Sequence, residues 1–303
     1  MPGLLILLAI ALAVTFVVLT TLIVTEARRP PRHTAGYALA RGLACDPAEL
    51  GLAFDQWWLD LGRGVRLPVW EIADARRGGP GPAPAHSLTA ILVHGWGHSR
   101  IDMLPRIDLW RRIADRIILY DLRGHGDAEG GLSSLGAGED DDLLALIERL
   151  GDGPFLLVGH SMGAVIAIHA EARDDERARR IAGIVAYGPY ADFHTSIRGR
   201  LKSTGFPARP LTDLAMLWLR LTGVRHRDAA HDAAALRCPL LIIHGTEDAI
   251  APFAHGEMLV DAAADAALHA VAGGGHLDAH LLDERAHDEA VRAFAARIAP
   301  GQS

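Results

Sequence analysis

A serine between two glycines stands where two apolar segments meet. Residues 155–158 (Phe-Leu-Leu-Val) predict a buried strand, Gly159-His-Ser-Met-Gly163 follows, and residues 164–171 predict a helix. A strand that runs directly into a helix requires a very tight turn, and the flanking glycines leave room for that turn. Because such a turn lifts the serine hydroxyl out of the sheet edge, the pattern predicts that Ser161 is a nucleophile.

A serine hydroxyl is a poor nucleophile at neutral pH, so the pattern also requires a base and a residue that orients the base. Residues 239–244 predict a strand, and the turn after it brings Asp248 just past the strand end, whereas Glu247 suits solvent. The last predicted strand, 268–272, leads through three glycines to His276. We expect these three residues to form a triad in the chain order serine, acid, histidine.

Two backbone N–H groups are expected to bind the oxyanion of an acyl-transfer reaction. Met162 begins the helix after the serine, so its N–H points toward the place where an anion would lie. Trp96 belongs to the loop His94-Gly-Trp-Gly97 at the end of the predicted strand 88–93, where glycines let the backbone approach a ligand. We interpret His94 and His98 as residues that shape this loop and not as bases.

Strands and helices alternate along most of the chain, which indicates βαβ units and a parallel sheet. An antiparallel hairpin is expected at the sheet edge, from 54–61 and 65–72, and a helix over 103–116. Residues 78–85 are rich in glycine and proline and predict a loop. The acidic run 139–142 predicts a solvated helix N-terminus with no carboxylate site.

Five motifs fall in a familiar order along residues 47–298. They are His94-Gly-Trp-Gly, Asp121-Leu-Arg-Gly-His-Gly, Gly159-His-Ser-Met-Gly-Ala, His244-Gly-Thr-Glu-Asp-Ala-Ile-Ala-Pro and Gly273-Gly-Gly-His. In these motifs the chain resembles the α/β-hydrolase superfamily, in particular the Bem46-like and monoglyceride-lipase-like serine hydrolases. The resemblance implies an α/β-hydrolase fold, with a mostly parallel central sheet flanked by helices and a small helical lid, and it implies no cofactor.

The same resemblance implies a role for each site residue. Ser161 is expected to be the nucleophile, His276 the general base and then acid, and Asp248 the residue that orients the histidine. The backbone N–H groups of Trp96 and Met162 are expected to be the oxyanion donors. A serine at this position also argues against haloalkane dehalogenation, which needs a carboxylate nucleophile there.

The N-terminal segment has a different character. Residues 4–24 carry no charge and are long enough to span the ~30 Å hydrocarbon core of a bilayer as a helix. We expect a transmembrane anchor; a cleaved signal peptide is the alternative, but Lys and Arg are missing before the apolar run. Arg28, Arg29 and Arg32 follow the run, so the positive-inside rule puts the catalytic part in the cytoplasm.

The predicted domain organisation has three parts. Residues 1–27 are the anchor, 28–46 a stiff and solvated linker that contains Arg-Pro-Pro-Arg, and 47–303 the α/β-hydrolase domain. Residues 192–237 are expected to form the lid, with room for two or three helices. The apolar face of residues 211–221 either lines an acyl pocket or packs on the core.

Composition excludes several classes of partner. A net charge of -7 and an isoelectric point near 6.1 give no basic surface for nucleic acid. The cysteines, Cys45 and Cys238, are in no metal-ligand spacing and are expected to be buried free thiols, although a disulfide between them is an alternative. The histidines are scattered, and His226 and His231 lie five residues apart, so we predict no metal site.

These observations predict a membrane-anchored serine hydrolase that acts on carboxylic esters, including lipid or other acyl esters. A peptidase, amidase or thioesterase that uses the same triad is an alternative. A non-catalytic scaffold that keeps the fold and binds a partner or lipid is another. Covalent reactivity of Ser161 separates the scaffold from the enzymes.

Overall fold

The computed structural model describes residues 2–72, 88–203 and 208–298, so the loop expected at 78–85 lies outside the described residues. Its helices and strands, in chain order, are α1 (Pro2–Arg28), α2 (Ala35–Ala40), η1 (Pro47–Leu50), β1 (Asp55–Asp60), β2 (Arg66–Ile72), β3 (Thr89–Val93), η2 (Arg100–Arg106), α3 (Ile107–Arg111), β4 (Arg116–Tyr120), α4 (Glu139–Leu150), β5 (Phe155–His160), α5 (Met162–Glu171), η3 (Ala178–Arg180), β6 (Ile181–Tyr187), α6 (Phe193–Ser203), α7 (Ala208–Leu221), α8 (Ala229–Ala233), β7 (Leu240–Gly245), α9 (Ala254–Ala262), β8 (Ala266–Val271), α10 (Ala279–Leu282) and α11 (Glu284–Ile298).

The strands form one eight-stranded sheet with the order β1-β2-β4-β3-β5-β6-β7-β8. The hairpin β1–β2 lies at one edge and pairs antiparallel with β4, and every other neighbouring pair is parallel. The central strands are continuous apolar runs because helices cover both of their faces. The mostly parallel sheet and its antiparallel edge hairpin are as the sequence predicts.

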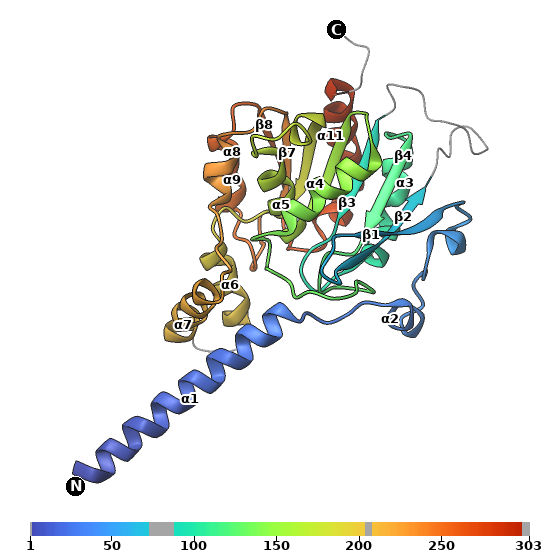
Figure 1. Cartoon of the computed structure of the whole chain (residues 1–303). Coiled ribbons are helices and arrows are strands. Elements are labelled where there is room, and N and C mark those ends of the chain that lie inside the picture. The colour runs from blue at the N-terminus through green and yellow to red at the C-terminus, as the bar shows by residue number, and fades with distance from the viewer. Residues whose placement is uncertain (1, 73–87, 204–207, 299–303) are drawn as a thin grey trace.

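Successive residues of each strand point to opposite faces of the sheet and supply two hydrophobic cores. On β3, Ile91 and Val93 join the core beneath α4, α5 and α9, whereas Ala90 and Leu92 join the core beneath η2, α3 and α11. Figure 1 shows α4 and α5 in front of the strands and α11 behind them. Because β3, β5, β7 and β8 run in the same direction, their carboxyl ends lie at the same end of the sheet.

The prediction of one helix over residues 103–116 is wrong in extent. The segment is a 3-10 turn, η2, followed by the short helix α3, which ends at Arg111, and β4 begins at Arg116. Pro105 lies inside η2, and its ring nitrogen has no hydrogen to donate to an α-helical bond. Ser99 and Asp102 form a capping box at the start of η2.

The acidic run 139–142 begins α4 as predicted, but the expectation of a solvated face is wrong. The side chains of Glu139, Asp140 and Asp142 are buried. The Glu139 carboxylate accepts hydrogen bonds from the Ser134 backbone N–H and hydroxyl, at 2.7 and 2.9 Å. Asp140 pairs with Arg173 at 3.0 Å. These carboxylates can be buried because their partners replace the lost hydrogen bonds to water. The same bonds hold the preceding loop and the neighbouring helices in place.

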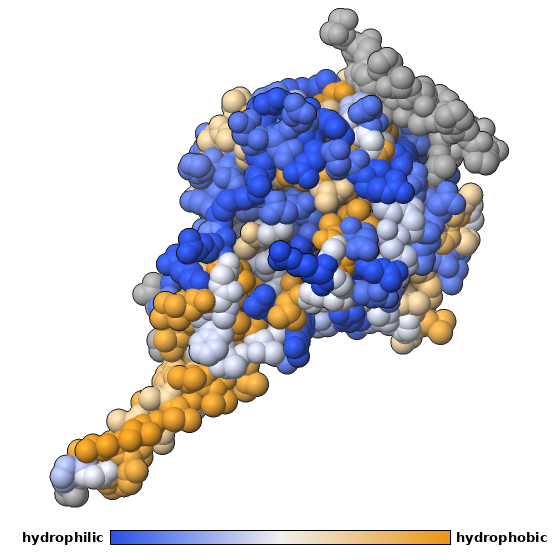
Figure 2. All heavy atoms as spheres, viewed as in Figure 1, coloured by the Kyte–Doolittle hydropathy of each residue, from blue (hydrophilic) through white to orange (hydrophobic). Residues whose placement is uncertain are grey.

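The N-terminal segment contacts the rest of the chain at its inner end. Helix α1 projects from the domain with exposed apolar side chains along it, and its inner part packs against α7 (Figures 1 and 2). The following segment is not a freely solvated linker, because Pro30 is buried and the Arg32 guanidinium donates to the carbonyl oxygens of Gly126 and Ala128, at 3.3 and 2.9 Å.

The expected free cysteines are present as free thiols. Cys238 is buried, whereas Cys45 is half-buried, so the prediction of two buried thiols is wrong for Cys45. Cys45 lies in the loop between α2 and η1, where its thiol reaches the carbonyl oxygen of Ala35 at 3.5 Å.

Candidate active site

Ser161 occupies the one-residue turn between β5 and α5. Its φ angle is +52°, in the left-handed region that residues with a side chain rarely adopt, and its backbone N–H donates to the carbonyl oxygen of Tyr187 at 2.8 Å. The bond to Tyr187, the last residue of β6, holds the turn on the neighbouring strand. The serine is thus fixed in a strained conformation with its hydroxyl at the carboxyl edge of the sheet.

The two glycines around Ser161 are required by close backbone approaches. A Cβ atom on Gly163 would lie 2.2 Å from the carbonyl oxygen of Val93 and 2.6 Å from that of His94. A Cβ atom on Gly159 would lie 2.4 Å from the Cα of Ala164. All three distances are too short for a carbon atom, so only glycine lets α5 begin against the ends of β3 and β5.

The structure brings Ser161, His276 and Asp248 together at the carboxyl ends of β5, β8 and β7. His276 Nε2 lies 2.9 Å from Ser161 Oγ, and His276 Nδ1 lies 2.6 Å from Asp248 Oδ2. An ionised carboxylate can only accept, so Nδ1 carries the ring proton and Nε2 is left to accept from the serine hydroxyl. The arrangement can move a proton from the hydroxyl to the imidazole.

Asp248 is held as a buried anion. Its Oδ1 accepts hydrogen bonds from the backbone N–H groups of Ile250 and Ala251, both at 2.8 Å. Burial alone would raise the pKa of Asp248, but the contacts of its carboxylate with His244 and His276, together with the backbone donors, outweigh burial and lower that pKa. The group therefore stays ionised at neutral pH and stabilises a protonated His276.

The loop that carries Trp96 lies directly against the nucleophile. A Cβ atom on Gly95 would be 3.2 Å from the carbonyl oxygen of His160 and 3.4 Å from the Ser161 Cβ. Met162 is the first residue of α5, where N–H groups have no intrahelical acceptor. Trp96 and Met162 line the same cavity as Ser161.

Comparison with known proteins identifies the family. Residues 90–294 match the alpha/beta hydrolase family, a span of more than half of the chain. The chain belongs to the alpha/beta hydrolase family. The hydrolase is 27% identical over 168 residues to the lysophosphatidylserine lipase ABHD12 of Danio rerio, a match that covers 52% of this chain and 43% of that protein.

Two solved structures are similar to the hydrolase in fold. An esterase of Pyrococcus furiosus has a TM-score of 0.68 at 19% identity, over 90% of this chain and 99% of that chain. A membrane phospholipase A described as a bacterial virulence factor has a TM-score of 0.59 at 16% identity, over 99% of this chain and 98% of that chain. At these identities the likeness shows the fold.

His94 and His98 of the hydrolase lie outside the triad. His94 is fully buried and bridges two loops, with Nδ1 2.8 Å from the Gly95 carbonyl oxygen and Nε2 accepting from the Leu122 N–H at 3.0 Å. Burial lowers the pKa of His94 well below its ordinary value, so its ring stays neutral. Its contacts agree with a role in shaping the loop.

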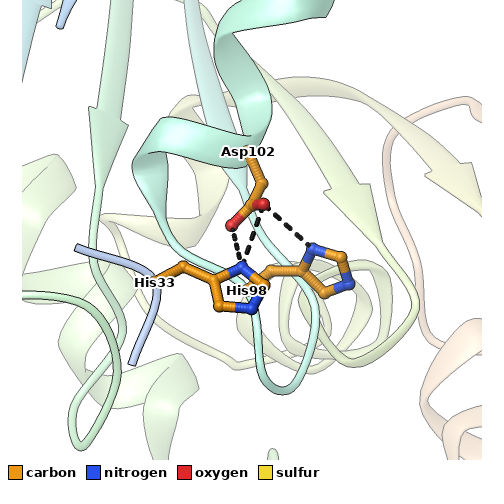
Figure 3. Close-up of side chains that lie close together, drawn as sticks. All are labelled: His33, His98 and Asp102. Atoms are coloured by element: carbon orange, nitrogen blue, oxygen red, sulfur yellow. Dashed lines mark hydrogen bonds and ion pairs between the residues drawn. The ribbon is translucent and has the colours of Figure 1, made fainter. Parts of the chain in front are cut away.

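A cluster of His33, His98 and Asp102 was not foreseen from the sequence (Figure 3). His33 Nδ1 lies 2.9 Å from Asp102 Oδ2, and His98 Nδ1 lies 3.6 Å from Asp102 Oδ1. One ligand atom from each residue lies within 4.8 Å of the others, so the three could hold a metal ion. The motif Ser99-x-x-Asp102 signals the cap that Asp102 makes, but no local pattern points to His33, 69 residues away.

Asp102 already has several hydrogen-bond donors. Its Oδ2 accepts from the Ser99 backbone N–H at 2.7 Å in addition to His33. Burial opposes ionisation, yet the bonds from His98, His33 and Ser99 lower the pKa of Asp102. The cluster ties the segment after α1 to the loop beside the nucleophile.

A cavity of about 540 Å³ adjoins Ser161 and falls in the size range of small-molecule sites. Its wall is mostly apolar and comes from α1, α6 and the loops around the nucleophile; it is lined by Leu19, Leu22, Ile23, Glu26, Ala27, Pro31, Trp96, Leu135, Ser161, Met162, Tyr190, Phe193, Ser196, Ile197 and Ile250. None of the described lining residues belongs to α7. Leu211, Met216 and Leu219 are buried, so this part of residues 211–221 packs on the core, whereas Trp218 is exposed.

Proposed function

We propose that the protein is a serine hydrolase that cleaves carboxylic esters through an acyl-enzyme. The observation that carries the proposal is the pair of short contacts that joins Ser161 Oγ to His276 Nε2, at 2.9 Å, and His276 Nδ1 to Asp248, at 2.6 Å. A nucleophile, a base and an orienting carboxylate in this geometry perform acyl transfer on several unrelated folds. The esterase and lipase among the similar proteins support the ester as the substrate class.

The first half of the reaction forms the acyl-enzyme. Ser161 Oγ bonds to the acyl carbon while its proton passes to His276 Nε2, and the carbonyl electron pair moves to the oxygen. The N–H groups of Trp96 and Met162 bind that oxyanion, and losing one such donor typically costs ~10²- to 10³-fold in rate. Collapse of the intermediate expels the alcohol, which leaves with the proton from His276.

The second half releases the acid. A water molecule gives a proton to His276 Nε2 as its oxygen bonds to the acyl carbon, and the same oxyanion site is used again. Collapse then breaks the bond to Ser161 Oγ, which regains the proton. Asp248 keeps its negative charge throughout and stabilises the imidazolium that forms in each half.

The proposal includes a membrane anchor and the predicted division into residues 1–27, 28–46 and 47–303. Helix α1 is long and apolar enough to cross a membrane, a criterion that a signal sequence near the N-terminus also meets. The arginines that follow the apolar run favour a cytoplasmic catalytic domain. A hydrolase held at the bilayer would meet esters of membrane lipids.

Hydrolysis of p-nitrophenyl butyrate by the full-length protein in detergent micelles tests the proposal. We expect kcat/KM to fall by at least ~10³-fold in Ser161→Ala and in His276→Ala, because each variant removes one member of a unit that acts together. His231→Ala is the matched control, since that side chain is 85% exposed, and it should keep wild-type activity. Wild-type protein that is folded but inactive on esters, or an active Ser161→Ala variant, would refute the proposal.

A further inference from the structure

One face of α1 forms part of the cavity beside the nucleophile. The lining residues from this helix are Leu19, Leu22, Ile23, Glu26 and Ala27. Their spacing of three and four residues places them on a single face, over ~12 Å of helix axis. The same helix is the candidate membrane span. Part of the wall around the reacting serine therefore belongs to a segment with the composition of a membrane anchor.

The C-terminal end of α1 is fixed to the loops of the active site. The Trp96 indole N–H donates to the carbonyl oxygen of Ala27 at 2.7 Å, so the loop that carries Trp96 is hydrogen-bonded to the helix. Arg28 and Ser133 exchange two bonds, from the Ser133 N–H at 3.1 Å and from the Arg28 Nε at 3.2 Å. These bonds set the distance between the lining face of α1 and Ser161.

The cavity is open along α1. Leu22 lines it and is still 54% exposed, so the wall does not close at this position. On α6, Phe193 and Ile197 supply further apolar wall. A mostly apolar channel that leads from a reacting serine along a helix suits a hydrocarbon chain, because each buried methylene contributes favourably.

Helix α7 adds an exposed apolar face next to α1. Leu214, Leu217, Trp218 and Leu221 are spaced three and four residues apart, and all are exposed. Helix α7 packs against α1, and Figure 2 shows apolar residues at the base of α1 as well as along its length. A tryptophan and leucines on such a face are typical of a helix that lies in a membrane interface.

We propose that α1 is a wall of an acyl-chain site, so that the anchor itself selects esters with a long acyl chain taken from the lipid layer. The proposal rests on the proposed function, because the acyl carbon must reach Ser161. The acyl chain of the substrate lies between α1 and α6. The exposed apolar face of α7 keeps the opening of the cavity at the membrane surface. Short soluble esters use the same triad without touching α1.

Chain-length selectivity of α1 variants tests this proposal. We would measure kcat/KM of the full-length protein in detergent micelles for p-nitrophenyl acetate and p-nitrophenyl laurate. Ile23→Trp fills the cavity from α1 and should lower the laurate value by at least about tenfold while acetate stays within about twofold. Val17→Trp makes the same change on the opposite, 55% exposed face of α1 and should alter neither value.

The possible results separate this proposal from the proposed function. If wild-type protein hydrolyses neither ester, the serine hydrolase proposal fails. If it hydrolyses both esters and Ile23→Trp leaves the ratio of laurate to acetate unchanged, or Val17→Trp changes that ratio equally, the role of α1 is refuted while the triad stands. Should Ile23→Trp not fold, Ile23→Ala widens the cavity and must also change the ratio for the proposal to stand.

Retention of α1 is a separate requirement. Intact-mass measurement of the protein purified from membranes should show that residues 2–28 are still present. Protein that is found only without this segment would overturn the proposal, because the wall would then be missing from the mature enzyme.

Discussion

The choice between two neighbouring carboxylates illustrates how single residues acquire their roles. Asp248 is buried, contacts His276 and accepts the N–H groups of Ile250 and Ala251, whereas Glu247 is exposed. The sequence favours Asp248 from its position after the strand, and the structure supplies the reason. Only the side chain at 248 is shielded from water, so only its charge acts strongly on the imidazole.

Asp248→Asn should lower kcat for p-nitrophenyl butyrate by ~10³- to 10⁴-fold, because the amide leaves the imidazole in the wrong tautomer and cannot stabilise its cation. Since the pKa of Asp248 is held below its ordinary value, the carboxylate stays charged at pH 6 as well as at pH 8, and Asp248→Asn should lower kcat at both pH values. Glu247→Gln is the matched control and should change kcat by less than about twofold. Equal losses in the two variants would contradict this assignment.

Contacts between distant residues that belong to no recognisable motif could not be predicted. The triad candidates were found because each follows a strand in a short motif with glycines or a turn. His33 and Asp102, and Trp96 and Ala27, meet 69 residues apart in the sequence, where no local pattern connects them. Such contacts are set by the packing of whole elements.

At the scale of elements, the tight junction of β5 and α5 against β3 fixes the site. The strands were predictable because buried parallel strands are continuous apolar runs. The solvated face expected for residues 139–142 was wrong, since partners such as Ser134 and Arg173 allow these carboxylates to be buried. The burial of a charged residue can be predicted only when its distant partners in the sequence are known.

Gly163→Ala tests the close contact at this junction. The new methyl group would meet the Val93 carbonyl oxygen at 2.2 Å, so α5 or the end of β3 must move. We expect the free energy of unfolding to fall by about 1–3 kcal/mol and ester hydrolysis to decrease. Gly36→Ala in α2 is the matched control, because its Cβ would have only Thr34 Oγ1 nearby, at 3.8 Å. A Gly163→Ala variant as stable and active as Gly36→Ala would contradict the account.

At the scale of the whole molecule, α1 joins the proposed anchor to the active site. Its length and apolar composition were evident from the sequence. Its part in the cavity was not, because a helix that is apolar on every face gives no sign of which face contacts the domain. The position of the helix follows instead from its packing against α7 and from polar contacts at its end, such as the bond from Trp96 to Ala27.

The central claim is that Ser161 is an activated nucleophile, and covalent labelling tests it most directly. Full-length protein in detergent micelles would be treated with a fluorophosphonate, beside Ser161→Ala, His276→Ala and His231→Ala. The account predicts that wild type and His231→Ala gain one label, found on the peptide that contains Ser161, and that the other two variants stay unlabelled. Folded wild-type protein that remains unlabelled, or that is labelled at another residue, would contradict it.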